Sequence, residues 1–99
     1  MIKKKIREIL KTGYKFETDS FILYFKKRDD LKIGFITSSK IGKPTQRNRI
    51  KRIIREKIRE RFESGDFLII LKKNIIENSK EEIRDNIEKV ADEISYKIN

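Results

Sequence analysis

The chain has 99 residues, a length that fits one domain, and its 26 Lys and Arg against 16 Asp and Glu give a net charge of +10. It contains no Cys and no His, which excludes disulfides, thiolate metal sites and the commonest general base. No apolar run approaches the ~20 residues that cross a bilayer. The first ten residues also lack the apolar stretch of a signal peptide, so we expect a cytoplasmic protein with no membrane partner.

The first predicted element is a short amphipathic helix over residues 2–12. Gly13 follows it and fits a C-terminal cap. The residues at helical spacing are Ile2, Ile6, Ile9 and Leu10.

Strands are predicted next. Residues 14–17 suit a brief strand, and residues 20–28 and 31–39 are rich in the β-branched and aromatic side chains typical of longer strands. Two consecutive aspartates, at 29–30, signal a turn between the long strands. We therefore expect residues 20–39 to form a β-hairpin.

A long helix is predicted over residues 45–63, with Pro44 at a favourable first position. Lys57 and Arg61 fall inside its apolar arc, and we expect their stems to lie on the core with the charged heads in water. The apolar arc holds Ile50, Ile53, Ile54, Ile58 and Phe62. The opposite arc holds Asn48, Arg52, Arg55 and Arg59.

The pattern of the last third of the chain, from residue 67 onward, predicts one more strand and one more helix. Residues 67–73 are nearly all apolar, which suits a central strand covered on both faces. Ser79 and Glu82 form a capping-box pattern at the start of the last helix. Its apolar stripe is Ile83, Ile87, Val90, Ala91 and Ile94. One sheet with helices packed against it is the economical arrangement.

Positive charge is concentrated in the middle of the chain. Residues 40–61 hold ten basic and two acidic residues, whereas residues 62–99 carry a net charge of −3. A solvated helix face is the simplest interpretation of such a run. An arginine-rich stripe without acids instead favours phosphate, which guanidinium groups bind in a bidentate manner. Membrane binding is less favoured, because the opposite face is needed as core.

The segment "RNRIKRIIRE" resembles the signature of the bacterial ribonuclease P protein subunit. The preceding "IGFITSSKIGKPTQ" and the following "GDFLIILKK" are also similar to that family, so the resemblance covers nearly the whole chain. It implies an α+β fold in the order αβββαβα, with one mixed four-stranded sheet and a left-handed crossover through the basic helix. That hand is an exception to the usual rule.

The resemblance also implies a function. In the family, an RNA subunit uses Mg²⁺ to cleave the 5′ leader from precursor tRNA, and the protein binds both RNAs. The resemblance therefore implies that residues 1–99 form a single RNA-binding domain. It implies no small-molecule substrate. The residues expected to bind the catalytic RNA are Lys40, Lys43, Arg47, Asn48, Arg49, Lys51, Arg52, Arg55 and Arg59. The residues expected in a cleft for the leader are Ile6, Leu10, Tyr24 and Ser38. Ile6 and Leu10, which stand where the family often has aromatic residues, also fit a place in the core.

Three other functions stay open at this stage. A basic structural protein of the ribosomal kind would bind RNA without affecting tRNA processing. A DNA-binding regulator would need base-reading side chains, and Asn48 is the only suitable one in the stripe. An independent nuclease would need carboxylates that hold a metal. The acids of this chain are dispersed, with one pair in the turn at 29–30 and others spread along the last helix, so no metal-binding or catalytic residue is predicted.

Overall fold

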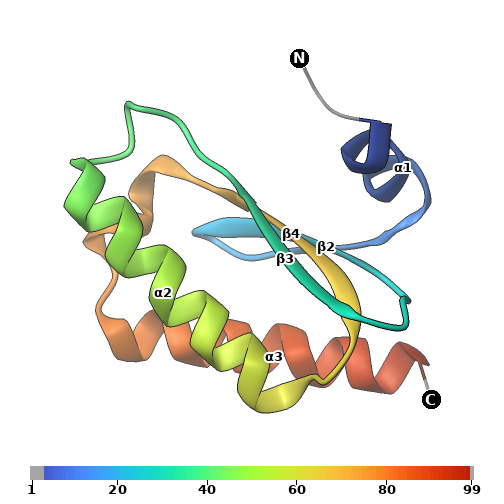
Figure 1. The fold of residues 1–99 in the computed structure, drawn as a ribbon. Coiled ribbons are helices and arrows are strands. Elements are labelled where there is room, and N and C mark those ends of the chain that lie inside the picture. Colours follow the sequence, from blue (N-terminus) through green and yellow to red (C-terminus); the bar gives the residue numbers. More distant parts are fainter. Residues whose placement is uncertain (1–3, 99) are drawn as a thin grey trace.

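A computed structural model describes residues 4–98 of the chain (Figure 1). It has the predicted α+β order of three helices and a four-stranded mixed sheet, with a short 3₁₀ helix as an addition. The predicted start of the first helix at Ile2 lies outside the described residues. The elements are α1 (Lys4–Thr12), β1 (Tyr14–Glu17), β2 (Phe21–Lys26), β3 (Leu31–Ile36), α2 (Pro44–Arg61), β4 (Gly65–Leu71), η1 (Lys73–Glu77) and α3 (Lys80–Ile98).

The predicted hairpin over residues 20–39 is wrong. The strand order is β1-β2-β4-β3, so β4 lies between β2 and β3. It is antiparallel to β2 and parallel to β3, and the Gly65 N–H donates to the Asp30 carbonyl at 2.9 Å, at the turn that was expected to close the hairpin. The physical reason is burial, because the most apolar strand of the sheet takes a central place, where both of its edges are paired.

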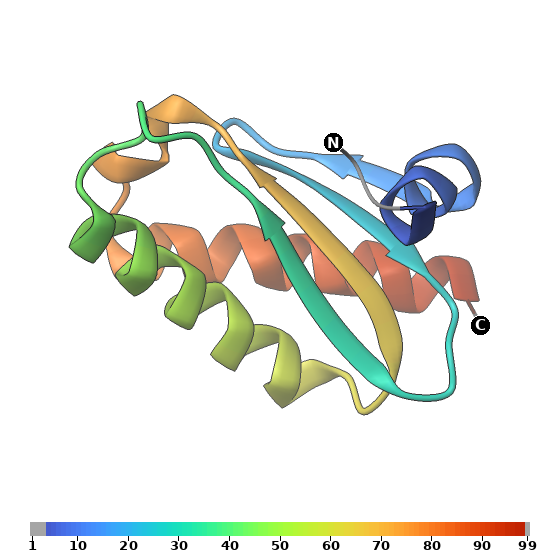
Figure 2. The ribbon, with the colours of Figure 1, turned by 45° about the horizontal axis from the view of Figure 1, so that its top comes forward.

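The connection from β3 through α2 to β4 is left-handed, as the family resemblance implied. In Figure 2 the parallel strands β3 and β4 point upward, β4 lies to the right of β3, and the helix layer lies behind the sheet. The chain therefore moves from left to right by a path behind the sheet. This hand is rare for a parallel pair, and it carries the basic helix along the β3 side of the molecule.

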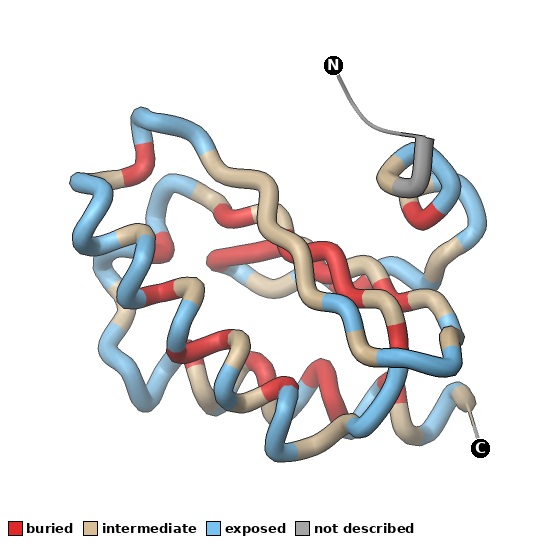
Figure 3. The backbone as a smooth tube through the Cα atoms, in the orientation of Figure 1, coloured by how far each residue is buried: buried red, intermediate tan, exposed pale blue. Residues whose placement is uncertain are grey.

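The two long helices cover one face of the sheet, and α1 lies on the other face (Figures 1 and 3). As predicted, the α2 isoleucines at positions 50, 53, 54 and 58 are buried, at 3% exposure or less. They pack with alternate residues of the strands, including Leu23, Phe67 and Ile69. On the α1 face, Ile9 and Leu68 are buried, while Ile70 is only half-buried. The central strand is thus fully covered on one face and partly on the other.

Two local details go beyond the sequence prediction. Gly13 caps the C-terminus of α1 as predicted, since its N–H donates to the Ile9 carbonyl at 2.9 Å, although among the glycines described φ is positive only at Gly42 and Gly65. It is required by close approach, because a Cβ there would lie 2.5 Å from the Ile9 carbonyl oxygen. The segment after β4 is also more than a connector, since η1 places the fully buried Ile75 in the core.

Ion pairs fix α2 against α3. Lys57 and Arg61 lie on the core side of α2, as predicted, but their heads do not lie in water. The Lys57 ammonium contacts Glu88 at 2.6 Å, and Arg61 pairs with both Glu88 and Asp92, the latter at 2.9 Å. The Lys57 and Arg61 side chains are only 16% and 26% exposed. Because two of its cations are already paired in this way, α2 is held in one orientation about its own axis.

The predicted capping box opens α3. The Ser79 N–H donates to the Glu82 carboxylate at 3.0 Å, and the Glu82 N–H donates to the Ser79 hydroxyl at 3.1 Å. The bond from the Ser79 main chain, with a further contribution from its hydroxyl, holds the pKa of Glu82 below its usual value. A carboxyl whose pKa is depressed by folding stabilises the fold above the pKa of the unfolded chain, about 4.3 for Glu.

We therefore expect the substitution Glu82→Gln to lower the free energy of unfolding at pH 7, since glutamine keeps the hydrogen bonds of the box but loses the charge. The difference from the unsubstituted protein should shrink as the pH falls through the folded-state pKa of Glu82. Urea unfolding between pH 7 and pH 3 measures it. Glu81→Gln, at a neighbouring exposed position, is the matched control, and an equal pH-dependent difference in both variants would contradict the prediction.

Candidate nucleic-acid interface

The outward face of α2 presents cations that form no ion pair with an acid of the described chain. Asn48, Arg52 and Arg59 are exposed, and Arg55 is half-buried. Within residues 4–98, none of the three arginines takes part in a salt bridge. The α2 charges that do pair belong to Lys57, Glu60 and Arg61, on the side that faces α3. The helix is therefore divided into a paired side and a free side.

Arg55 joins this face to the sheet. Its guanidinium carbon lies 5.4 Å from the centre of the Phe35 ring, a cation–π distance. Phe35 is half-buried at the outer edge of the sheet, on β3. The contact restrains the Arg55 head beside β3 while leaving donors of its guanidinium open to a ligand.

Arg47 has a different environment from the other predicted RNA-binding residues. Its Nη1 donates to the main-chain oxygens of Gly42, Ile41 and Ser39 at 2.9, 3.3 and 3.4 Å. These carbonyls belong to the loop between β3 and α2, so the guanidinium holds that loop in shape. The side chains of Lys40 and Lys43 in the same loop are exposed. Arg47 thus organises the loop that presents them.

The start of α2 is well suited to an anion. Lys43 is the N-cap residue, and its side chain makes no capping hydrogen bond. Its main-chain N–H donates to Gln46 at 2.8 Å. First-turn N–H groups without side-chain acceptors, together with the positive end of the helix dipole, favour a phosphate. The remaining predicted residues of this surface, Arg49 and Lys51, are exposed and half-buried respectively.

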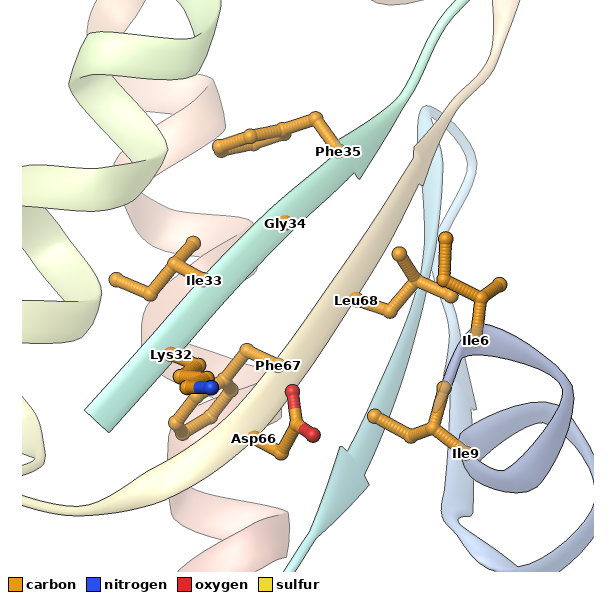
Figure 4. A pocket seen from close by; sticks show the side chains of 9 residues that line it. All are labelled: Ile6, Ile9, Lys32, Ile33, Gly34, Phe35, Asp66, Phe67 and Leu68. Carbon is orange, nitrogen blue, oxygen red and sulfur yellow. The ribbon is translucent and has the colours of Figure 1, made fainter. Parts of the chain in front are cut away.

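A cleft lies on the other side of the sheet, between α1, β3 and β4 (Figure 4). Its cavity has a volume of about 260 Å³. Its lining residues are Ile6, Ile9, Lys32, Ile33, Gly34, Phe35, Asp66, Phe67 and Leu68. One rim is charged, because Asp66 lies 3.7 Å from the Arg28 guanidinium, whose closer partner is Asp30 at 2.6 Å. The hydrogen bond from Arg28 lowers the pKa of Asp30.

Of the four residues predicted for this cleft, only Ile6 lines the cavity. Leu10 lies further along α1 and is half-buried. Tyr24 is half-buried and lies beside Leu68 on the same face, since the two are Cα partners in the β2–β4 ladder. Ser38 is exposed in the loop, where its hydroxyl accepts from the Lys40 N–H at 3.1 Å. The cleft and Tyr24 are therefore neighbours, whereas Ser38 belongs with the basic loop.

Sequence reasoning missed several cleft residues. Lys32 and Gly34 are two residues apart on β3, and Asp66 and Leu68 are two residues apart on β4, so each pair lies on one face of its strand. Lys32 is the Cα partner of Asp66, and Gly34 is the Cα partner of Leu68. The period-two alternation was available as a signal, but it does not reveal which strands are neighbours. Because the hairpin was predicted wrongly, β3 and β4 were not placed side by side.

Metal ligands and membrane-spanning helices bear on the kind of site that residues 4–98 can form. No group of three or more His, Cys, Asp or Glu side chains in this range is placed to share a metal ion. No helix of the same range is long and apolar enough to cross a membrane.

Comparisons with known proteins agree on one family. The family model described as Ribonuclease P matches residues 2–95. A "Ribonuclease P protein component" from Bacillus velezensis is 33% identical over 88 residues, which are 83% of this chain and 76% of the relative. One from Nitratiruptor sp. is 27% identical over 95 residues, covering 93% and 87% of the two chains. The solved RNase P protein of Staphylococcus aureus superposes with a TM-score of 0.77 at 25% identity, covering 91% of this chain and 89% of that one.

The Arg47 contacts give a testable expectation. Arg47→Ala should loosen the loop of residues 38–43, because three main-chain oxygens lose their donor. Amide hydrogen exchange should become faster at Lys40 and Ile41 and stay unchanged in α3. Arg59→Ala is the control, since it removes the same charge from an exposed position of the helix. Equal exchange in the two variants would show that Arg47 does not hold the loop.

Proposed function

Because the chain belongs to the ribonuclease P protein family, we propose that it acts as the protein subunit of a bacterial ribonuclease P. In this role it binds the catalytic RNA and the 5′ leader of precursor tRNA, and the RNA cleaves the leader from the tRNA. The observation that carries the proposal is the pair of surfaces on opposite faces of one small sheet, one with free arginines and one with an apolar cleft. We place the protein, a single domain, in the cytoplasm with its RNA.

The basic surface is proposed to bind the catalytic RNA. Arg52 and Arg59 supply exposed guanidinium groups, and Arg55 supplies one restrained by Phe35. Arginine forms bidentate hydrogen bonds with phosphate, and held side chains lose less entropy on binding. Lys40, Lys43 and the first turn of α2 extend the surface at one end. Arg47 contributes by keeping the loop in place, and Asn48 can donate and accept hydrogen bonds beside the phosphates.

The cleft and the adjoining sheet face are proposed to hold the leader. Tyr24 offers a ring for base stacking, and Ile6 and Leu68 offer apolar walls. Lys32 on the rim suits a phosphate of the same strand. This face is supported from behind by the core, so its shape does not depend on the ligand. A single strand fits because its bases are free to lie on the sheet, whereas those of a duplex are already stacked.

Mg²⁺ is proposed to belong to the RNA subunit. The described part of the protein offers no cluster of acids fit to hold the ion. The protein would contribute to the chemistry indirectly, by binding the two RNAs and keeping the scissile bond in place. Positive charge on the protein also reduces repulsion between the RNAs, so less of the cation should be needed when the protein is bound.

Reconstitution with a bacterial ribonuclease P RNA tests the proposal. At low Mg²⁺, addition of the protein should accelerate cleavage of the leader from precursor tRNA. The RNA-free protein should show no cleavage. A basic structural protein of the ribosomal kind would bind the RNA but leave the cleavage rate unchanged, and that result would overturn the proposal.

The double substitution Arg52→Ala and Arg59→Ala should weaken binding of the catalytic RNA and make it less sensitive to salt. Because two phosphates no longer have a guanidinium partner, the slope of log affinity against log salt should flatten by about 1.4 to 1.8 units. Filter binding at salt concentrations of roughly 50 to 400 mM and fixed Mg²⁺ measures this slope. Lys73→Ala with Lys80→Ala, at exposed positions on η1 and α3, removes the same charge as a control. If the control pair flattens the slope equally, the α2 face is not the binding surface.

Substitution of Tyr24 by Ala should weaken binding of precursor tRNA by about tenfold and leave mature tRNA unaffected, since one stacked base contributes ~1–3 kcal/mol. Tyr24→Phe keeps the ring and should retain most of the affinity. The measurement is the dissociation constant of each tRNA from the assembled ribonucleoprotein. Equal losses for both tRNAs would remove Tyr24 from the leader path.

A further inference from the structure

Gly34 lies in the interior of β3 without a conformational reason for being glycine. Its φ is not in the left-handed region, where only Gly42 and Gly65 lie among the glycines described. Close packing does not require it either. A Cβ at this position would have the Leu68 Cδ1 at 3.7 Å and the Phe67 carbonyl oxygen at 4.0 Å, which are ordinary contact distances. Glycine weakens a strand interior, and there it often marks a place where a ligand comes close to the main chain.

The missing side chain of Gly34 opens the floor of the cleft. Figure 4 shows the neighbouring Ile33 and Phe35 side chains directed to the α2 side of β3, while Ile6, Ile9 and Leu68 lie on the α1 side. Bare main chain at Gly34 is thus part of the surface that the cavity presents to a ligand. The volume of about 260 Å³ is many times the roughly 10–15 Å³ that a single water needs in such a cavity. Such a space suits one flat ring with its sugar.

The surroundings of Gly34 point to a nucleotide as the occupant. Gly34, Leu68 and Tyr24 are consecutive Cα partners across β3, β4 and β2, so they form one cross-strand row. Tyr24 and Gly34 are two strand spacings apart, about 10 Å, so different nucleotides of one strand can occupy the two positions. In the next row, Lys32 and Asp66 are partners, and Asp66 has Arg28 beside it, which leaves Lys32 as a cation for a phosphate.

We propose that Gly34 is a specificity-determining residue of the leader cleft, where one leader nucleotide packs its ring directly on the β3 main chain. Ile6 and Leu68 form the walls of this subsite, and Lys32 faces the phosphate. The inference rests on the proposed function, since it assumes that the leader lies on this face. A side chain at position 34 projects into the cleft and not into the core, so it reduces leader binding without disturbing the fold.

The test uses the ribonucleoprotein assembled with a bacterial ribonuclease P RNA and the variants Gly34→Ala and Gly34→Val. The dissociation constants of precursor and mature tRNA are compared. We expect Gly34→Val to reduce the preference for precursor tRNA on the order of tenfold, the size of one base-stacking contribution, and Gly34→Ala to have a smaller effect. Mature tRNA affinity, catalytic-RNA affinity and the Tm of the protein should stay the same, or the Tm should rise as a β-former replaces glycine.

A rescue variant separates lost space from other causes. Adding Ile6→Ala to Gly34→Val reopens the cavity from the α1 side and should restore part of the preference for precursor tRNA. If the unsubstituted protein shows no such preference, the proposed leader function itself fails. If the unsubstituted protein prefers precursor tRNA and a folded Gly34→Val variant keeps that preference in full, the role of Gly34 is overturned. Should Gly34→Val lower the Tm, a folded Gly34→Ala with undiminished preference would overturn that role as well.

Discussion

The packing of four α2 isoleucines against the sheet is the constraint on which the rest of the structure depends. Each buried isoleucine contributes about 1.5–3 kcal/mol of hydrophobic stabilisation relative to exposure, and all four lie on one arc of the helix. A helix anchored in this way cannot rotate without exposing them. The arginines on the opposite arc are therefore held outward by the core, and no contact of their own is needed to keep them there.

The acidic side of α3 completes this arrangement. Glu88 and Asp92 pair with the two α2 cations nearest the core, so the basic charge is divided between a structural set and a free set. Leaving a partly buried cation unpaired would destabilise the fold. The sheet then separates two kinds of surface. One side carries the helices and the free guanidinium groups, and the other carries a cleft whose floor is main chain and whose walls are aliphatic.

Much of the fold could be predicted from local pattern. The isoleucine spacing fixed the orientation of α2, and the Ser79–Glu82 box placed the start of α3, because helix periodicity and capping are encoded within a few residues. The strands were found, but their neighbours were not. The predicted hairpin failed because pairing depends on where β4 inserts, and that is decided by burial of the whole sheet and not by the Asp29–Asp30 turn.

By itself, the sequence determined the helices, their buried faces, the basic stripe and the family resemblance, since each depends on residues close together in the chain. Only the tertiary structure decided which cations are free and which are paired. It brought Arg55 over Phe35 and joined α1, β3 and β4 around Gly34. The physical reason is that these contacts join residues made neighbours by sheet order and helix packing, and spacing along a single segment carries no record of such neighbours.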